Sequence, residues 1–453
     1  MDPVSISTIA EWADGRLSRG NPAATANAVS TDSRALEPGS LFVALRGEKF
    51  DGHDFLPQVA QSGAAGAVVE EAPADIPSDF ALLLVDDTLA ALQRMAASYR
   101  RTLPMKVINI TGSNGKTSTK DFTAAVLSRR GRVAKTQGNL NNHIGLPLTI
   151  LRASSREDFG VFEIGMNHPG EIAPLARIAR PDAAIITNIG VAHIEFMGTV
   201  EAIAQEKGTL AEAVRSGGFV VLPVDDPFTD SISARTRAKV IRAGIDHGDV
   251  YATDLRSTST GSSFWVHSHG SVAQGSLVAP GRHMVRNAML AVAVGLQYGV
   301  PLEECLEGLR SARLTKGRLE RKMIRGVCVF DDSYNANPDS MVAALETLGQ
   351  VSGRRIAVLG QMNELGVESD NGHRRVGEAA AREKIDCVIT VGPIAAGIAQ
   401  AAREHGVPLT LVPETTAEAA AILRSMARDG DTVLVKGSRS VKMETIVEEL
   451  ARA

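Results

Sequence analysis

Residues 106 to 119 combine a strand, a glycine turn and a helix start in the order that binds phosphate. The segment reads Lys106-Val-Ile-Asn-Ile-Thr-Gly-Ser-Asn-Gly-Lys-Thr-Ser-Thr119, with a β-branched run before the turn and apolar residues at helical spacing after it. Backbone N–H groups at a helix N-terminus, together with the positive end of the helix dipole, favour a bound phosphate. The segment therefore predicts a nucleotide site at the edge of an α/β sheet.

The residues of this turn predict which groups contact the nucleotide. Lys116 supplies a positive charge near the terminal phosphates, and Thr117 offers a hydroxyl to Mg²⁺. Only two residues separate the glycines, whereas the usual phosphate loop has four. We expect ATP to be bound by Gly112, Ser113, Asn114, Gly115, Lys116, Thr117 and Ser118.

The composition is that of a soluble, multi-domain protein. The chain has 453 residues, 44% of them hydrophobic and 22% charged. A net charge of −4 and an aromatic content of 4% argue against a nucleic-acid partner. Three widely spaced cysteines indicate buried thiols in a reducing compartment, and the longest apolar run is too short to span a bilayer. The first residues lack signal-peptide features, so we expect a cytoplasmic protein without membrane insertion.

Strands alternate with helical segments along most of the chain, which predicts parallel sheets covered by helices. Residues 253–278 are rich in Ser, Thr and Gly and predict a hairpin excursion, and residues 100–104 predict a linker. We expect an α/β protein of three domains: a small N-terminal domain (1–102), a central ATPase domain with a mainly parallel sheet (103–313), and a C-terminal Rossmann-like domain (314–453).

Two polar residues follow predicted strands of the central sheet. Glu163 ends the strand at residues 161–164, and His193 comes shortly after the strand at residues 183–187. A carboxylate at such a strand end is a candidate Mg²⁺ ligand, although both residues could also be structural. Lys207 lies in a helical stretch and, by residue type alone, is a solvated surface lysine.

The short loop Thr111-Gly-Ser-Asn-Gly-Lys-Thr117 resembles that of the Mur ligases and the related folylpolyglutamate synthetases, which join a carboxylate to an amine using ATP. The resemblance implies catalytic roles for Lys116, His193 and Lys207. It also implies two Mg²⁺ ions: one on Thr117 and Glu163, the other on His193 and a carbamate formed on Lys207. Burial that lowers the pKa of Lys207 is needed for that modification.

Further motifs extend the resemblance over residues 31 to 443 and imply a nucleotide-sugar substrate. Thr31-Asp-Ser-Arg34 and Asn139-Leu-Asn-Asn-His-Ile-Gly-Leu-Pro147 are similar to family segments that contact it. On the residues alone, both are polar turns. The resemblance implies contacts to the uridine-nucleotide substrate from Ser33, Arg34, Asn141, Asn142 and His143.

The last third supplies the other expected ATP contacts. Asp331-Asp-Ser-Tyr-Asn-Ala-Asn-Pro338 is similar to a family motif, which implies that Arg318 and Asp332 hold the ribose and phosphates and that Asn287 contacts adenine. The chain departs from the family at Met284, where members often have asparagine, and at Gln361, where an aspartate is usual.

These matches are most similar to the member that adds D-alanyl-D-alanine to UDP-N-acetylmuramoyl-tripeptide, which implies those two substrates and a monomeric enzyme. The Asp-Asn-Pro-Arg motif of the member that adds diaminopimelate or lysine is absent; Asp370-Asn-Gly-His373 departs from it. That enzyme and folylpolyglutamate synthetase are the alternatives within the family. A nucleotide-binding switch without ligase activity is the alternative from another class.

Overall fold

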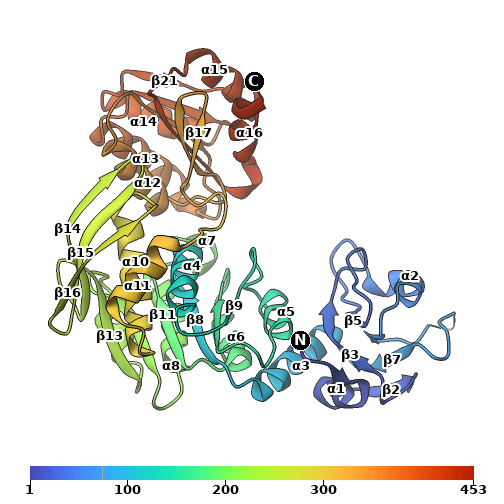
Figure 1. Cartoon of the computed structure of the whole chain (residues 1–453). Coiled ribbons are helices and arrows are strands. Elements are labelled where there is room, and N and C mark those ends of the chain that lie inside the picture. The colour runs from blue at the N-terminus through green and yellow to red at the C-terminus, as the bar shows by residue number, and fades with distance from the viewer. Residues whose placement is uncertain (74, 453) are drawn as a thin grey trace.

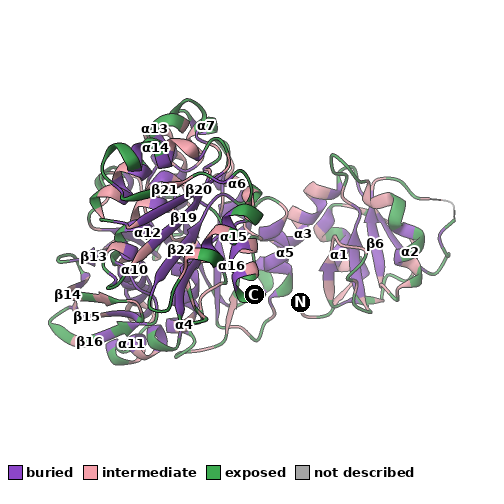
Figure 2. Cartoon of the chain, turned by 90° about the horizontal axis from the view of Figure 1, so that it is seen from above, coloured by how far each residue is buried: buried purple, intermediate pink, exposed green. Residues whose placement is uncertain are grey.

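The computed structural model describes residues 1–73 and 75–452, and it builds an α/β protein from sheets arranged along a bent path (Figure 1). The N-terminal part lies at the right of the figure, the central part at the lower left and the C-terminal part above it. Most strands are buried, whereas exposed residues gather on outer helices and loops (Figure 2). The predicted α/β fold with mainly parallel sheets is confirmed.

The N-terminal part contains a five-stranded sheet in the order β2-β7-β6-β5-β4, in which only the β2–β7 pair is antiparallel. Its strands are β2 (Arg16–Arg19), β4 (Ala28–Ser30), β5 (Ser40–Val43), β6 (Gly66–Val69) and β7 (Ala81–Leu84). A small ribbon joins β1 (Val4–Ser5) to β3 (Thr25–Ala26). The helices are α1 (Ile6–Ala13), η1 (Gly52–Phe55), α2 (Leu56–Gln61) and α3 (Thr88–Thr102).

Helix α3 continues into the segment that the sequence predicts as a linker and ends at Thr102. Asp87 caps its start by accepting the Ala90 N–H at 2.9 Å. Arg100 is buried in its last turn and donates to the carbonyls of Ala179, Leu103 and Met105. The predicted linker is therefore too long: residues 100–102 are helical and pack against the central part, and the connection to β8 begins at Leu103.

The central part is a nine-stranded sheet in the order β16-β15-β14-β13-β12-β11-β8-β10-β9. Strands β8 to β14 pair in parallel. The predicted hairpin excursion forms the antiparallel strands at one edge. The strands are β8 (Lys106–Thr111), β9 (Val133–Lys135), β10 (Phe159–Glu163), β11 (Ala183–Ile186), β12 (Phe219–Pro223), β13 (Lys239–Ile245), β14 (Val250–Thr258), β15 (Gly261–Ser268) and β16 (Ser271–Leu277).

Helices cover both faces of this sheet because alternate strand residues point to opposite sides. Ile108 and Ile110 of β8 share a core with α4 and α10, whereas Val107 shares another with α3 and α6. The helices are α4 (Lys116–Leu127), α5 (Gly145–Arg152), α6 (Ile172–Ala179), α7 (Ile194–Met197), α8 (Val200–Glu212), α9 (Thr229–Ser233), α10 (Arg282–Gln297) and α11 (Leu302–Ser311).

The C-terminal part is a six-stranded sheet in the order β17-β18-β22-β19-β20-β21, parallel except for the edge strand β17. Its strands are β17 (Glu320–Ile324), β18 (Val327–Asp332), β19 (Arg355–Gly360), β20 (Cys387–Val391), β21 (Leu409–Leu411) and β22 (Thr432–Lys436). The helices are α12 (Pro338–Gly349), η2 (Gly366–Glu368), α13 (Ser369–Arg382), α14 (Ala396–Glu404), α15 (Thr416–Met426), η3 (Arg439–Val441) and α16 (Glu444–Arg452).

The expectation of buried thiols is confirmed in the described part of the chain. All three cysteines, Cys305, Cys328 and Cys387, are free thiols and buried. Within residues 1–73 and 75–452, each helix is too short or too polar to cross a membrane.

Candidate functional site

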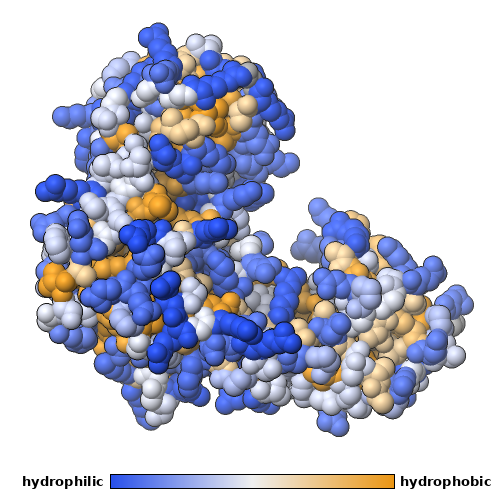
Figure 3. Space-filling model, viewed as in Figure 1, coloured by the Kyte–Doolittle hydropathy of each residue, from blue (hydrophilic) through white to orange (hydrophobic). Residues whose placement is uncertain are grey.

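The carboxyl ends of the central strands border a cavity of about 950 Å³ that is lined by residues from all three parts of the chain. Figure 3 shows the molecule hollowed between its upper C-terminal part and its right-hand N-terminal part. The phosphate loop lines the cavity, Gln93 of α3 reaches it from the N-terminal part, and Asp332 and Lys436 reach it from the C-terminal sheet. Groups separated widely in sequence therefore share one space.

The phosphate loop adopts a backbone that only glycine fits at two positions. Gly112 has φ 146° and Gly115 has φ 80°. A Cβ at Gly112 would lie 1.9 Å from Thr187 Oγ1, and one at Gly115 would lie 2.7 Å from the Asn287 side-chain amide. Both glycines are therefore required by close contacts as well as by backbone conformation.

Neighbouring segments hold the loop in place. The N–H of Ser113 donates to the carbonyl of Asn188 at 2.9 Å, and the N–H of Asn114 donates to the side chain of the same asparagine at 2.8 Å. Lys116 extends back over the loop and donates from Nζ to the Gly112 carbonyl at 2.7 Å. Burial lowers the pKa of Lys116 to about 8, an effect that Glu163 opposes and Arg318 reinforces. The loop is thus preorganised, with its lysine at the centre.

Glu163 lies where a divalent cation fits. It ends β10 and is 1% exposed, and its Oε2 accepts long hydrogen bonds from Thr117 Oγ1 at 3.3 Å and Asn141 Nδ2 at 3.4 Å. Its other oxygen, Oε1, is buried without a hydrogen-bond partner among the described residues. A buried carboxylate beside a threonine hydroxyl offers oxygen ligands of the kind that Mg²⁺ takes.

Two buried charged residues next to Glu163 were missed in the sequence analysis. Lys120 is 1% exposed, and its Nζ lies 3.4 Å from Glu163 Oε1 and 3.5 Å from Asp121 Oδ1. Asp121 is 2% exposed and also accepts from Lys135 Nζ at 2.7 Å. The sequence contained one signal for these residues. Lys120 comes one helical turn after Lys116 on a helix that is otherwise buried, and a buried charge without a partner is costly.

His193 and Lys207 occupy different environments. His193 caps α7 with φ 64° and places Nδ1 2.5 Å from Oε2 of Glu364, whose pKa that hydrogen bond lowers. Lys207 is 1% exposed on α8, so it is not a solvated helix lysine. Burial moves the pKa of Lys207 well below its usual value; Lys116 reinforces the shift, and Glu206 opposes it. His193 lines the cavity, whereas Lys207 is not among its described lining residues.

Residues expected to hold the nucleoside gather at the C-terminal side of the cavity. The Arg318 guanidinium lies 4.1 Å from the centre of the Tyr334 ring. Asp332 accepts from Lys436 Nζ at 2.5 Å, and burial lowers the pKa of Lys436 despite that contact. Asn287 lines the cavity against Gly115.

The two residues that depart from the family pattern, Met284 and Gln361, lie in different surroundings. Met284 is 2% exposed and belongs to the core shared by α4 and α10. Gln361 lies after β19 and donates from Nε2 to Asn363 Oδ1 at 3.0 Å.

The residues expected to contact the nucleotide sugar do not form a single cluster. Asn141 contacts Glu163, whereas the side chain of Asn142 accepts the N–H of Gly145, the first residue of α5, at 2.8 Å. The carbonyl of His143 accepts from Gln93 at 3.0 Å. Ser33 and Arg34 follow β4 and are not among the described residues lining the cavity; Arg34 pairs with Asp32 at the surface.

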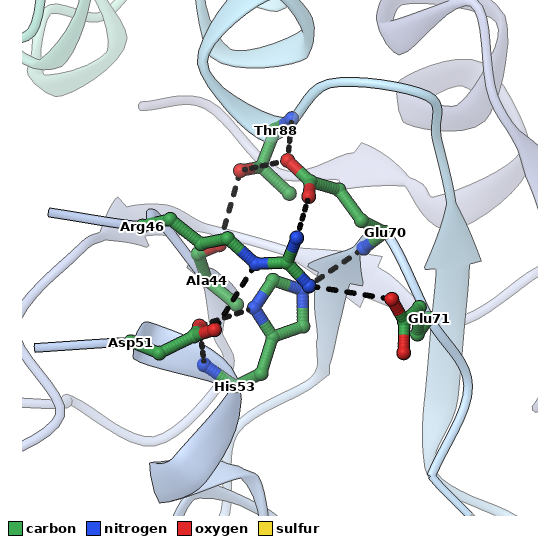
Figure 4. Close-up of polar contacts among 7 residues, drawn as sticks. All are labelled: Ala44, Arg46, Asp51, His53, Glu70, Glu71 and Thr88. Carbon is green, nitrogen blue, oxygen red and sulfur yellow. Dashed lines mark hydrogen bonds and ion pairs between the residues drawn. The ribbon is translucent and has the colours of Figure 1, made fainter.

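A polar network orders the loops at the carboxyl edge of the N-terminal sheet (Figure 4). Arg46 pairs with Asp51 at 3.0 Å and with Glu70 at 3.1 Å. His53 contacts the Asp51 carboxylate through Nδ1 at 2.6 Å, and its Nε2 accepts the Glu70 N–H at 3.0 Å. Thr88, the first residue of α3, donates to the Ala44 carbonyl at 3.0 Å. The network connects the loops after β5 and β6 to α3, whose residue Gln93 reaches the cavity.

Comparisons with known proteins agree along the whole chain. Residues 25–100 match the model of the Mur ligase family catalytic domain, 110–295 the Mur ligase middle domain and 317–439 the Mur ligase glutamate ligase domain. The chain is 38% identical over 454 residues to the UDP-N-acetylmuramoyl-tripeptide--D-alanyl-D-alanine ligase of Escherichia coli, covering 99% of each protein.

Solved structures are similar as well. A crystal structure of MurF from Acinetobacter baumannii superposes with a TM-score of 0.91 at 34% identity, covering 100% of this chain and 99% of the other. The MurF ligase of Thermotoga maritima in complex with ADP has a TM-score of 0.84 at 28% identity, covering 94% and 97%. The chain therefore belongs to the Mur ligase family.

Proposed function

We propose that this chain is an ATP-dependent ligase that attaches D-alanyl-D-alanine to UDP-N-acetylmuramoyl-tripeptide. The product is the UDP-linked pentapeptide used in peptidoglycan precursor synthesis. The observation that supports this best is the full-length similarity to ligases named for that reaction. The cavity adds a phosphate loop and lining residues from all three parts of the chain, so it has room for several reactants.

The reaction follows from the chemistry of amide formation. The tripeptide carboxylate attacks the γ-phosphate of ATP and forms an acyl phosphate, releasing ADP. The dipeptide amine then attacks the acyl carbon, and phosphate leaves as the amide forms. Phosphoryl transfer needs positioning and neutralisation of charge more than covalent help from the protein.

The residues of this chain supply most of that neutralisation. Lys116 and Arg318 both line the cavity, and the charge of Arg318 contributes to lowering the pKa of Lys116. We propose that the loop N–H groups and Lys116 hold the β- and γ-phosphates, with Arg318, Asp332 and Asn287 fixing the rest of ATP. A cation at the phosphates is worth roughly 10²-fold or more in rate.

We propose that one Mg²⁺ is held by Thr117 and Glu163 and a second by His193 and carbamylated Lys207. The described residues contain no group of three His, Cys, Asp or Glu side chains arranged as a metal site. The oxygens of a carbamate on Lys207 would complete a set of metal ligands that His193 alone cannot provide. When bound, the ions neutralise phosphate charge and polarise the transferred group.

Phosphate release tests the proposed function. The purified chain is given ATP, Mg²⁺ and UDP-N-acetylmuramoyl-tripeptide, and D-alanyl-D-alanine, diaminopimelate and glutamate are compared as acceptors. We expect release of phosphate and formation of pentapeptide with the dipeptide. Addition of diaminopimelate to the UDP-linked dipeptide, or of glutamate to a folate, would assign a different ligase. ATP hydrolysis that depends on neither substrate would indicate a nucleotide switch.

A further inference from the structure

Glu364, an acidic side chain of the C-terminal part, contacts the histidine of the loop that carries His193. Glu364 follows β19, and its Oε2 lies 2.5 Å from His193 Nδ1. The carbonyl of Glu364 also accepts the Glu195 N–H at 3.2 Å. Helix α7, which His193 caps, packs against η2 just beyond Glu364 and lies where the central and C-terminal parts meet (Figure 1).

Both partners in this contact have an unusual backbone conformation. His193 has φ 64° and Glu364 has φ 61°, a left-handed region that side chains other than glycine rarely adopt. Such residues persist where the surrounding structure holds them, and they concentrate at functional sites. Two of them face each other here, across the boundary between two sheets.

Two other contacts join the same parts without touching His193. Asn337 donates from Nδ2 to Asn114 Oδ1 at 2.8 Å, and Asp339 Oδ2 accepts the Val191 N–H at 3.1 Å. The C-terminal part is therefore docked on the phosphate loop and on the segment after β11 independently of Glu364. The Glu364 side chain can be removed while these contacts remain.

We propose that Glu364 is a positioning residue: by holding Nδ1 of His193, it directs the other ring nitrogen, Nε2, toward the metal and phosphate region of the cavity. This rests on the proposed function, in which His193 is a metal ligand. Metal-binding histidines commonly donate their second ring N–H to a carboxylate, which fixes both the tautomer and the orientation of the ring. Here that carboxylate comes from a different part of the chain, so docking of the C-terminal part completes the site.

Mn²⁺ binding tests this role separately from activity. The variants are Glu364→Ala and Glu364→Gln, with Glu368→Ala as the control because Glu368 is exposed and lies one turn further on. Free Mn²⁺ is measured by electron paramagnetic resonance in the presence of saturating ADP. We expect Glu364→Ala to weaken Mn²⁺ binding about 10-fold or more. We expect Glu364→Gln to weaken Mn²⁺ binding less. The Glu368→Ala variant should bind Mn²⁺ as the parent does, and the affinity for ADP without metal should not change.

Small-angle scattering of the same samples distinguishes positioning from docking. We expect the Glu364→Ala variant to scatter like the parent, with a reduced kcat and an unchanged KM for ATP. Unchanged Mn²⁺ affinity, or a variant that scatters as an opened molecule, would overturn the proposal. A parent that binds Mn²⁺ and ADP but forms no pentapeptide would count against the proposed function instead, and the comparison of Mn²⁺ affinities would still be valid.

Discussion

Burial gives the side chain of Lys207 chemistry that its residue type does not indicate. A lysine in water is protonated at neutral pH and does not react with CO₂. Lys207 is 1% exposed, and burial, with Lys116 nearby, lowers its pKa well below the usual value. A lower pKa increases the neutral fraction, so the amine can attack CO₂, form an N–C bond and release a proton to give a carbamate. A carbamylated Lys207 would carry a negative charge in place of a positive one.

We expect Lys207→Ala to lose nearly all activity and to recover part of it when formate or acetate is added. A small carboxylate can occupy the space of the missing side chain and supply oxygens where the carbamate would be. The readout is phosphate release with and without the added acid, with Glu201→Ala on the exposed side of α8 as the control. An alanine variant as active as the parent would exclude the carbamate, and a variant that no carboxylate rescues would count against it.

At the scale of single elements, local patterns predicted the strands and helices that carry the site. The β-branched run before the loop became β8, the apolar periodicity after it became α4, and Glu163 ends β10 as expected. Contacts between distant segments were not predictable in this way. Glu364 lies 171 residues from His193, and nothing in the local sequence of either residue indicates the pairing. Both residues also have left-handed backbone conformations, which the residue types themselves do not indicate.

Helix α4 shows another such connection, between the phosphate loop and the segment that leads to the C-terminal sheet. Asp121 Oδ2 accepts both the N–H and the hydroxyl of Thr315, each at 2.8 Å and across 194 residues of sequence. Its Oδ1 accepts from Lys135. Because α4 begins at Lys116, this helix connects the phosphate loop to the start of the C-terminal part. This segment is therefore anchored on the nucleotide site.

We expect Asp121→Asn to lower the free energy of unfolding by about 1.5–3 kcal/mol, the usual contribution of a hydrogen bond to a charged group. The amide keeps the size of the carboxylate but cannot accept every donor that now surrounds it. Scanning calorimetry should show a midpoint lowered by a few degrees, with a smaller change for Thr315→Val, which keeps the backbone bond. Asp86→Asn serves as the control because Asp86 is exposed. A midpoint equal to that of the parent would show that Thr315 is held by other contacts.

On the scale of the whole molecule, described residues from all three parts of the chain meet around one cavity. Gln93 reaches it from the N-terminal part, the phosphate loop from the centre, and Asp332 from the C-terminal sheet. In the ligase reaction, the tripeptide carboxylate must first meet the γ-phosphate and then the incoming amine. A cavity shared by all three parts suits such a reaction, because its reactants can enter from different sides.

The order of the chemistry gives the last prediction. If the carboxylate is activated first, ATP and UDP-N-acetylmuramoyl-tripeptide should form an acyl phosphate before any dipeptide is present. Reversal of that step scrambles the bridging oxygen of ATP, so positional isotope exchange should appear with these two substrates alone, and borohydride should trap the intermediate. D-alanyl-D-alanine should then convert it to pentapeptide, whereas single amino acids should do so poorly. Exchange that requires the dipeptide would exclude a free-standing acyl phosphate and would indicate that amine binding precedes phosphoryl transfer.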